Sequence, residues 1–300
     1  MIMQKEAPNI ADEDDGEVKA VPLRRPGRWI AGVALVALVA LAVRSIATNS
    51  RFQWGVVGHY LFDDRVLSGL LVSIELTALA MILAIVLGVV LAIMRMSANP
   101  VSRALSWVYI WVFRGIPMLV QILFWSFVGA LYPLFYLGIP FGPSFFSVSA
   151  NKAIPSIVAA LLGLGLAEAA YMAEIVRAGF ESVDEGQVEA GQCIGLRSWQ
   201  ILAYITLPQA MRVMIPPTGN EIIGMLKNTS LVSVIAATDL LYSVKNIYAV
   251  NYDVIPLLIV ACIWYLACTS VLYVAQAAIE RRLKRGDRVN GGGRVTRAAS

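Results

Sequence analysis

Six ionisable residues lie within otherwise apolar stretches of the chain, and their positions indicate a polar pathway. They are Glu75, Arg114, Glu168, Glu174, Glu221 and Lys227. Charged side chains at membrane depth cost free energy and normally face a cavity or a partner, so this set is larger than a plain membrane anchor needs. Several of them lie beside residues that break helices. Backbone freed by such a break is tolerated only where it lines protein or water.

The best candidate for a polar cavity wall is the pair Asn220 and Glu221, which follows Pro216-Pro217. The polar residues 228–230 extend this wall. The alternative is that the charged groups pair with one another or extend to the membrane surface. That alternative suits three residues best: Arg114, Glu174 and Arg177.

The motifs of common enzyme sites are missing from the sequence. It has no G-x-x-x-x-G-K-[ST] phosphate loop, no H-E-x-x-H, no C-x-x-C and no G-x-S-x-G. The three cysteines lack metal-binding spacing, and His59 is the single histidine. We therefore expect no enzyme, no metal, no cofactor and no nucleic-acid partner, which leaves transport or membrane anchoring.

Composition places the protein in a lipid bilayer. Hydrophobic residues make up 58% of the 300 residues and charged residues 15%, against roughly 25% charged in a soluble domain. Apolar runs of about 20 residues recur, which is the length that a helix needs to cross the bilayer. We expect an all-α integral membrane protein with about six transmembrane helices, near 29–47, 68–94, 104–131, 154–175, 210–235 and 255–279. The third is interrupted at 114–117 and the fifth at Pro216-Pro217.

The positive residues orient these helices. Most of the 24 Lys and Arg residues lie in the tails at 1–28 and 280–300 and in the connections on that same side, which is typical of the cytoplasmic side. Both termini and residues 181–208 are therefore predicted to be cytoplasmic. The opposite connections, at 44–67, 132–153 and 236–254, are rich in aromatic residues that suit the headgroup layer.

Residues 181–208 are predicted to form two short helices. Ser182 and Glu185 have capping-box spacing, and Gly195 is suited to the left-handed end of a helix. Ser198 begins a second helix, which Pro208 ends because proline lacks the backbone donor. Such a rigid cytoplasmic element is built for a partner to hold. The other interpretation is an ordinary ordered loop.

The spacing within this element resembles the EAA loop of binding-protein-dependent ABC importer permeases. That pattern is Glu-Ala-Ala, three residues, Gly, nine residues and Ile-x-Leu-Pro. The matching residues here are Glu189, Ala190, Gly191, Gly195, Ile205, Leu207 and Pro208. Gly191 replaces the second alanine, which is one small residue for another.

Other stretches resemble the polar amino-acid branch of that family, which serves histidine, glutamate, glutamine, arginine and opines. Phe113–Gln121 is similar to F-R-G-T-P-x-L-x-Q, with Ile116 in place of threonine. Residues 169–177 are similar to A-Y-x-A-E-x-x-R, and residues 216–231 to P-P-x-x-N-E…L-K-[DN]-T-S-L. The similarity covers about 67–279. It leaves the tail at 1–28 and the helix at 29–47 outside.

The resemblance implies a five-helix permease core at 67–279 with the coupling loop 181–208, an extra helix at 29–47 and a basic tail at 280–300. It implies a multi-pass protein of the bacterial plasma membrane. Its partners would be a second permease subunit, the same or different, two copies of an ABC ATPase that carry ATP and Mg, and an extracytoplasmic amino-acid-binding protein. The coupling residues would contact the ATPase.

An amino-acid zwitterion needs a polar path through hydrocarbon. The candidate lining residues are Gln121, Glu168, Asn220, Glu221 and Thr229, and their acidic members favour a cationic substrate such as arginine, lysine or an opine. Two other functions remain open. One is an ion-coupled secondary transporter that works through Glu75 or Glu221, and the other is a membrane anchor without transport.

Overall fold

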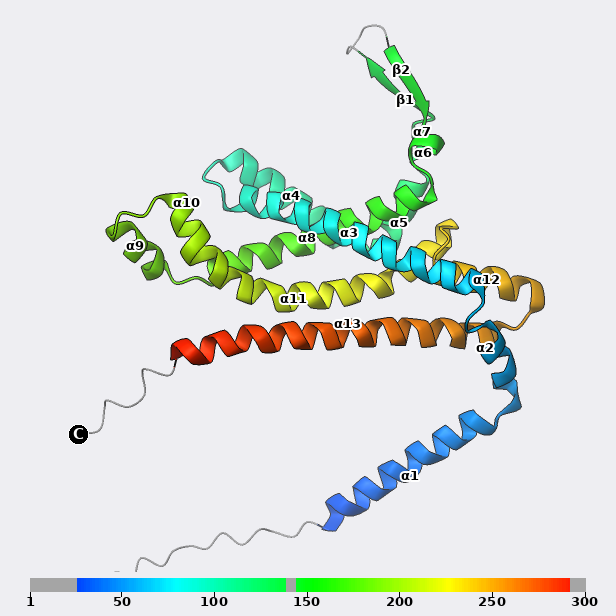
Figure 1. Ribbon diagram of the computed structural model, residues 1–300. Coiled ribbons are helices and arrows are strands. Elements are labelled where there is room, and N and C mark those ends of the chain that lie inside the picture. The colour runs from blue at the N-terminus through cyan, green and yellow to red at the C-terminus, as the bar shows by residue number, and fades with distance from the viewer. Residues whose placement is uncertain (1–25, 139–143, 292–300) are drawn as a thin grey trace, which may run out of the picture. The chain divides into compact units, whose positions relative to one another are not determined.

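The computed structural model describes residues 26–138 and 144–291, which form long helices and one small β-hairpin (Figure 1). The α-helices are α1 (Pro26–Thr48), α2 (Trp54–Tyr60), α3 (Asp64–Met96), α4 (Pro100–Gly115), α5 (Met118–Ser126), α6 (Val128–Leu131), α7 (Ala150–Ala153), α8 (Ser156–Glu181), α9 (Glu185–Cys193), α10 (Ser198–Ile201), α11 (Leu207–Asn228), α12 (Leu240–Asn251) and α13 (Val254–Gly291). The strands are β1 (Leu134–Gly138) and β2 (Ser144–Ser149). Most of the predicted tail 1–28 and the end of the tail 280–300 lie outside the described residues.

Four described helices are long and apolar enough to cross a membrane, and five if the bent pair α4 and α5 is one span. They are α1, α3, α8 and α13, with α4–α5 as the fifth. The remaining expected span, α11, is not apolar enough, since it carries Arg212, Glu221 and Lys227. The expected helical membrane fold is therefore present, whereas the count of six spans is not confirmed. Residues 1–52, which include α1, form one compact unit, and residues 53–300 form another.

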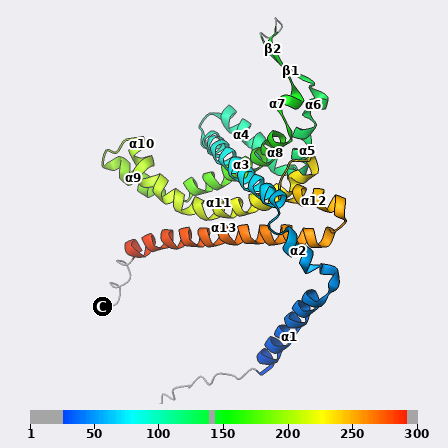
Figure 2. The same ribbon diagram turned by 45° about the vertical axis from the view of Figure 1, so that its right-hand side comes forward.

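Helix α8 lies at the centre of the larger unit, beside α3 in both views (Figures 1 and 2). Glycines permit the close approach. A Cβ atom on Gly88 of α3 would lie 2.6 Å from the Cβ of Met172, and one on Gly163 of α8 would lie 2.7 Å from the Cα of Ile122 on α5. Lipid tails are as apolar as leucine side chains, so membrane helices associate through such close backbone contacts.

The span predicted to break at 114–117 does break there. Helices α4 and α5 meet at an angle of 99°. Ile116 is extended, with φ −102° and ψ 130°, because the ring of Pro117 disfavours a helical residue before it. The bend places Arg114 at the end of one helix and Gln121 one turn into the next.

Three expectations are corrected. Pro216 and Pro217 do not break their helix, since both lie inside α11. Neighbouring helices in a membrane protein compensate for the missing donors. The chain is not entirely α-helical, since the connection at 132–153 contains a β-hairpin. Its strands β1 and β2 pair antiparallel from Leu134–Ser149 to Gly138–Ser144. Both strands are rich in aromatic residues, which favour strands. Helix α13 does not end at 279 but continues to Gly291.

Asp239 lies at the start of α12, where this helix meets α3 and α13. It is fully buried, and it caps α12 by accepting hydrogen bonds from the backbone N–H groups of Leu241 and Tyr242, each at 3.0 Å. The hydroxyl of Tyr265 on α13 lies 3.4 Å from its Oδ2. The hydroxyl of Ser73 on α3 accepts a hydrogen bond from the backbone N–H of Leu240, the residue after Asp239, at 3.0 Å. Burial raises the pKa of Asp239 to about 6.

A pH dependence of stability follows from this raised pKa. The folded-state pKa of Asp239 lies above the usual value of 3.8, so its protonated form favours folding below about pH 4, and this contribution is lost as pH rises through 6. We expect the melting temperature in detergent to fall between pH 4 and pH 6.5, the interval between the two pKa values, by an amount equivalent to at most about 3 kcal/mol. Asp239→Asn keeps a capping oxygen and should flatten this profile. An equally steep profile in the variant would contradict the assignment.

Candidate functional site

The element at 181–208 begins with helix α9, which starts later than predicted. Ser182 lies at the end of α8, where its hydroxyl donates to the Gly179 carbonyl at 2.7 Å. Asp184 caps α9 instead, and its Oδ1 accepts from the Gly186 N–H at 2.8 Å. The predicted capping box of Ser182 and Glu185 is therefore wrong, because an aspartate one residue before the helix supplies the same acceptor.

Gly195 ends α9 as predicted, with φ +82°. Its N–H donates to the Gln192 carbonyl at 2.9 Å, and the Leu196 N–H donates to the Gly191 carbonyl at 3.1 Å. This pair of bonds is the Schellman motif, which satisfies the last carbonyls of a helix and requires a left-handed residue. The chain turns sharply here into α10.

The second helix is longer than predicted. It is capped at Arg197, so Ser198 is its first residue. Pro208 does not end it: α10 continues through a π-helical turn at Leu202–Thr206 directly into α11. The wider turn precedes the proline, whose ring would otherwise crowd the carbonyl four residues earlier. One helical path therefore runs from Ser198 to Asn228.

The predicted coupling residues divide into exposed and packed positions. Glu189 and Ala190 are exposed, whereas Gly191 is buried against the second helix. A Cβ atom on Gly191 would lie 2.8 Å from the Cδ1 of Ile205, so the missing methyl group lets this isoleucine approach. The element also exposes large apolar side chains, with exposed fractions of 77% for Ile194, 57% for Trp199 and 68% for Tyr204. An exposed apolar patch of this kind is typical of a protein contact.

A second candidate site is a cavity of about 420 Å³ between α4, α8 and α11. We call it the amphoteric cavity because groups of both charges line it: Arg114, Tyr171, Glu174, Arg177, Pro217 and Glu221 are among its residues. Arg177 is bound to Glu174 at 2.7 Å and to Glu181 at 2.6 Å. The guanidinium of Arg114 lies 5.0 Å from the ring centre of Tyr171. Among the described residues it has no carboxylate within salt-bridge distance.

Glu168 and Glu221 form an acidic pair between α8 and α11. Glu168 is 2% exposed, and its carboxyl group faces that of Glu221. Its Oε1 has no hydrogen-bond partner among the described residues. Two carboxyl groups held together inside a membrane protein favour a bound cation or a shared proton.

The other three candidate lining residues serve helix contacts. Gln121 is buried and donates through Nε2 to the carbonyls of Phe113 and Ile116, at 2.9 and 2.8 Å, so it bridges the bend. Asn220 accepts a hydrogen bond from Gln276 of α13 at 3.0 Å. The hydroxyl of Thr229 donates to the Leu226 carbonyl at 2.7 Å. None of the three lines the amphoteric cavity.

Sequence reasoning placed Arg114 with the paired charges and did not single out Tyr171. The pairing interpretation holds for Glu174 and Arg177 but not for Arg114, which stacks on an aromatic ring. One feature of the sequence could have set Arg114 apart from the paired charges: it lies directly before a helix break. Only the fold brings Tyr171 from α8 beneath it.

Comparison with known proteins identifies the family. The family described as binding-protein-dependent transport system inner membrane component matches residues 84–285. The chain belongs to this family. It is therefore a permease component of an ABC importer in the inner membrane, it works with an ATPase and a binding protein, and it is not an enzyme. The family predicted from the sequence is thereby confirmed, whereas the coupling role of individual residues stays a prediction.

Individual relatives agree with this assignment. The chain is 43% identical to the arginine transport system permease protein ArgU of Corynebacterium glutamicum over 94% of this chain and 88% of that protein. It is 36% identical to the L-cystine transport system permease protein TcyB of Bacillus subtilis, over 80% and 95% respectively. A crystal structure of an amino acid ABC transporter with histidines aligns with a TM-score of 0.61 and 32% identity, covering 73% of this chain and 94% of that chain.

The conformation of Gly195 yields a prediction for this permease. A side chain at φ +82° costs about 1–2 kcal/mol, so Gly195→Ala should loosen the turn between α9 and α10. We expect the variant to insert normally but to retain less of its ATPase subunit on co-purification. Gly58→Ala is the control, since a Cβ atom there would meet nothing within 4 Å. Equal retention of the ATPase by both variants would show that the turn is not needed.

The hydrogen bonds of Gln121 across the α4–α5 bend yield a second prediction for this permease. Gln121→Leu removes two donors and leaves two carbonyls unpaired at the α4–α5 bend, which should destabilise the permease by about 1–3 kcal/mol. Thermal unfolding in detergent measures the effect. Gln187→Leu, at an exposed position of α9, should change the melting temperature little. If Gln121→Leu unfolds at the same temperature as the wild type, the bend does not depend on Gln121, and Pro117 alone accounts for it.

Proposed function

We propose that the permease imports polar amino acids with a cationic side chain. The observation that carries this proposal is the amphoteric cavity, which is lined by Arg114, a guanidinium without a carboxylate partner among the described residues, and by Glu221 on a neighbouring helix. The buried Glu168 lies against Glu221 but does not line the cavity. The similarity to a permease of arginine transport supports the same substrate class. No specific observation favours the ion-coupled alternative.

The charges of the cavity complement those of such a substrate. Arg114 is placed to bind the α-carboxylate, because guanidinium groups bind carboxylates in a bidentate manner. Glu221 is placed to bind an ammonium or guanidinium group, whose charge would also offset that of the buried Glu168 beside it. Tyr171 stacks against Arg114 and so holds this guanidinium in place at the cavity. Glu174 is less available because Arg177 already occupies it.

The coupling mechanism follows from the continuous helix. Glu189 and the exposed patch of Ile194, Trp199 and Tyr204 would be held by the ATPase, and Gly195 would fix the angle between the two short helices. Glu221 lies on the same helical path as α10, about 30 Å further on at 1.5 Å per residue. ATPase closure at Ile205–Pro208 would therefore move one wall of the amphoteric cavity.

The assembly would contain two permease subunits, identical or different, and two ATPase subunits that carry ATP and Mg. No cofactor would bind this chain. Both termini would be cytoplasmic, in line with the distribution of Lys and Arg. The described end of α13 lies at the same end of the larger unit as α9 and α10 (Figure 1). An extracytoplasmic binding protein would deliver the amino acid at the opposite end, where α12 lies.

The acidic pair provides the test. In proteoliposomes that contain the assembled importer, Glu221→Gln should lower arginine uptake about tenfold or more, the factor that corresponds to the loss of about 1.4 kcal/mol. Glu75→Gln is the matched control, because Glu75 is exposed on α3 and lines none of these cavities. Uptake of radiolabelled arginine is the measurement. Normal uptake by the Glu221→Gln importer, or equal loss in both variants, would contradict the proposed role.

A further inference from the structure

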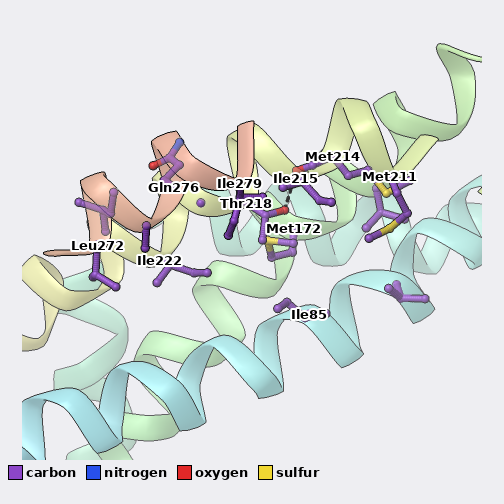
Figure 3. Close-up of a pocket in the computed structure, with 15 residues that line it drawn as sticks. Ile85, Met172, Met211, Met214, Ile215, Thr218, Ile222, Leu272, Gln276 and Ile279 are labelled. Carbon is purple, nitrogen blue, oxygen red and sulfur yellow. Dashed lines mark hydrogen bonds between the residues drawn. The ribbon is translucent and has the colours of Figure 1, made fainter. Parts of the chain in front are cut away.

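An apolar cavity of about 340 Å³ lies between α3, α8, α11 and α13, apart from the amphoteric cavity (Figure 3). Figure 3 shows side chains from all four helices around it, including Ile85, Met172, Met211, Ile222, Leu272 and Ile279. Its lining is almost entirely apolar, so it does not suit an amino-acid zwitterion. Its size falls within the usual range of small-molecule sites.

The cavity opens beside the cytoplasmic half of the helices. Its lining reaches Val176, five residues before the end of α8, and Met211, four residues into α11. On α13 it reaches Ile279. Under the proposed orientation, these residues lie near the inner leaflet of the membrane.

Basic residues follow the cavity on α13. Leu272, Gln276 and Ile279 line the cavity, and Arg282 continues the same helix face three residues later. Arg281 and Arg282 are exposed. The Nε of Arg281 donates to the Ala277 carbonyl at 3.0 Å, so this side chain bends back along the helix. The sequence adds Lys284 and Arg285 directly beyond.

We propose that this cavity holds an acyl chain of an anionic phospholipid from the cytoplasmic leaflet, with the headgroup against Arg282. The side chains that line an empty apolar cavity lack van der Waals contacts on one side, and an acyl chain in the cavity supplies these contacts. The methionines of the lining adapt to a flexible chain. Basic residues next to a transmembrane helix attract anionic headgroups, so the charge of the rim selects the lipid. The location rests on the proposed orientation, whereas lipid binding does not depend on transport.

Helix α11 links the proposed lipid site to the transport cycle. This helix forms one wall of the lipid site and one wall of the amphoteric cavity, and it continues from the coupling element. A lipid between α11 and α13 would therefore sense the movement that opens the substrate path.

Native mass spectrometry of the full chain tests the proposal. The protein is purified from membranes, exchanged into detergent that contains phosphatidylglycerol or phosphatidylcholine, and the retained lipid is counted. Wild type should retain one phosphatidylglycerol per chain in preference to phosphatidylcholine. Arg282→Gln should weaken this binding about fivefold, the contribution of one basic residue near an anionic surface. Arg103→Gln, the same charge change at an exposed residue of α4, should not.

A second pair of variants tests the cavity itself. Ala275→Phe places a ring in the cavity and should abolish lipid retention, while Ala278→Phe, on the same helix but outside the lining, should retain it. Unchanged retention in Ala275→Phe, or equal retention of both lipids by wild type, would overturn the proposal. So would a dimer of the chain that retains no lipid, because a second copy would then fill the cavity. Arginine uptake by the assembled importer is measured separately, so that a failure of the lipid site is distinguishable from a failure of the transport role.

Discussion

The close contact of α8 with its neighbours is the interaction on which the rest of the larger unit depends. Glycines on both sides bring α8 against α3, α5 and α11, as the contacts of Gly88 with Met172, Gly163 with Ile122 and Gly179 with Met214 demonstrate. In a bilayer no hydrophobic force favours one helix pair over contact with lipid, so this fit decides the arrangement. It also turns Glu168 and Tyr171 toward α11 and α4, where the polar path is proposed.

The same packing separates two kinds of cavity along α11. On one side the charged groups of α4 and α8 meet Glu221, and on the other side apolar side chains of α3 and α13 enclose a space without charge. Charged groups line the wall that a zwitterion would pass, and the lining of the opposite cavity carries no charged residue. Because α11 continues from the coupling element, both walls are linked to the surface that the ATPase would hold.

Sequence reasoning reached the membrane class, the family and the left-handed Gly195, since each rests on local composition or spacing. It located the break at 114–117 because Pro117 acts on its nearest neighbours. It misjudged Pro208 and Pro216-Pro217, because tertiary packing and a π-helical turn let a helix pass a proline. It could not find the contact of Arg114 with Tyr171 or the bridging role of Gln121, because these depend on which helix faces meet after folding.

We propose that movement of the coupling element, driven by a separate ATPase, carries an amino acid past Arg114 and Glu221. The most direct measurement is uptake of radiolabelled arginine into proteoliposomes that contain this permease, its ATPase and its binding protein. We expect uptake only when ATP and the binding protein are both present, and none from a proton or sodium gradient alone. Uptake by the purified chain under an ion gradient, without ATP, would contradict it.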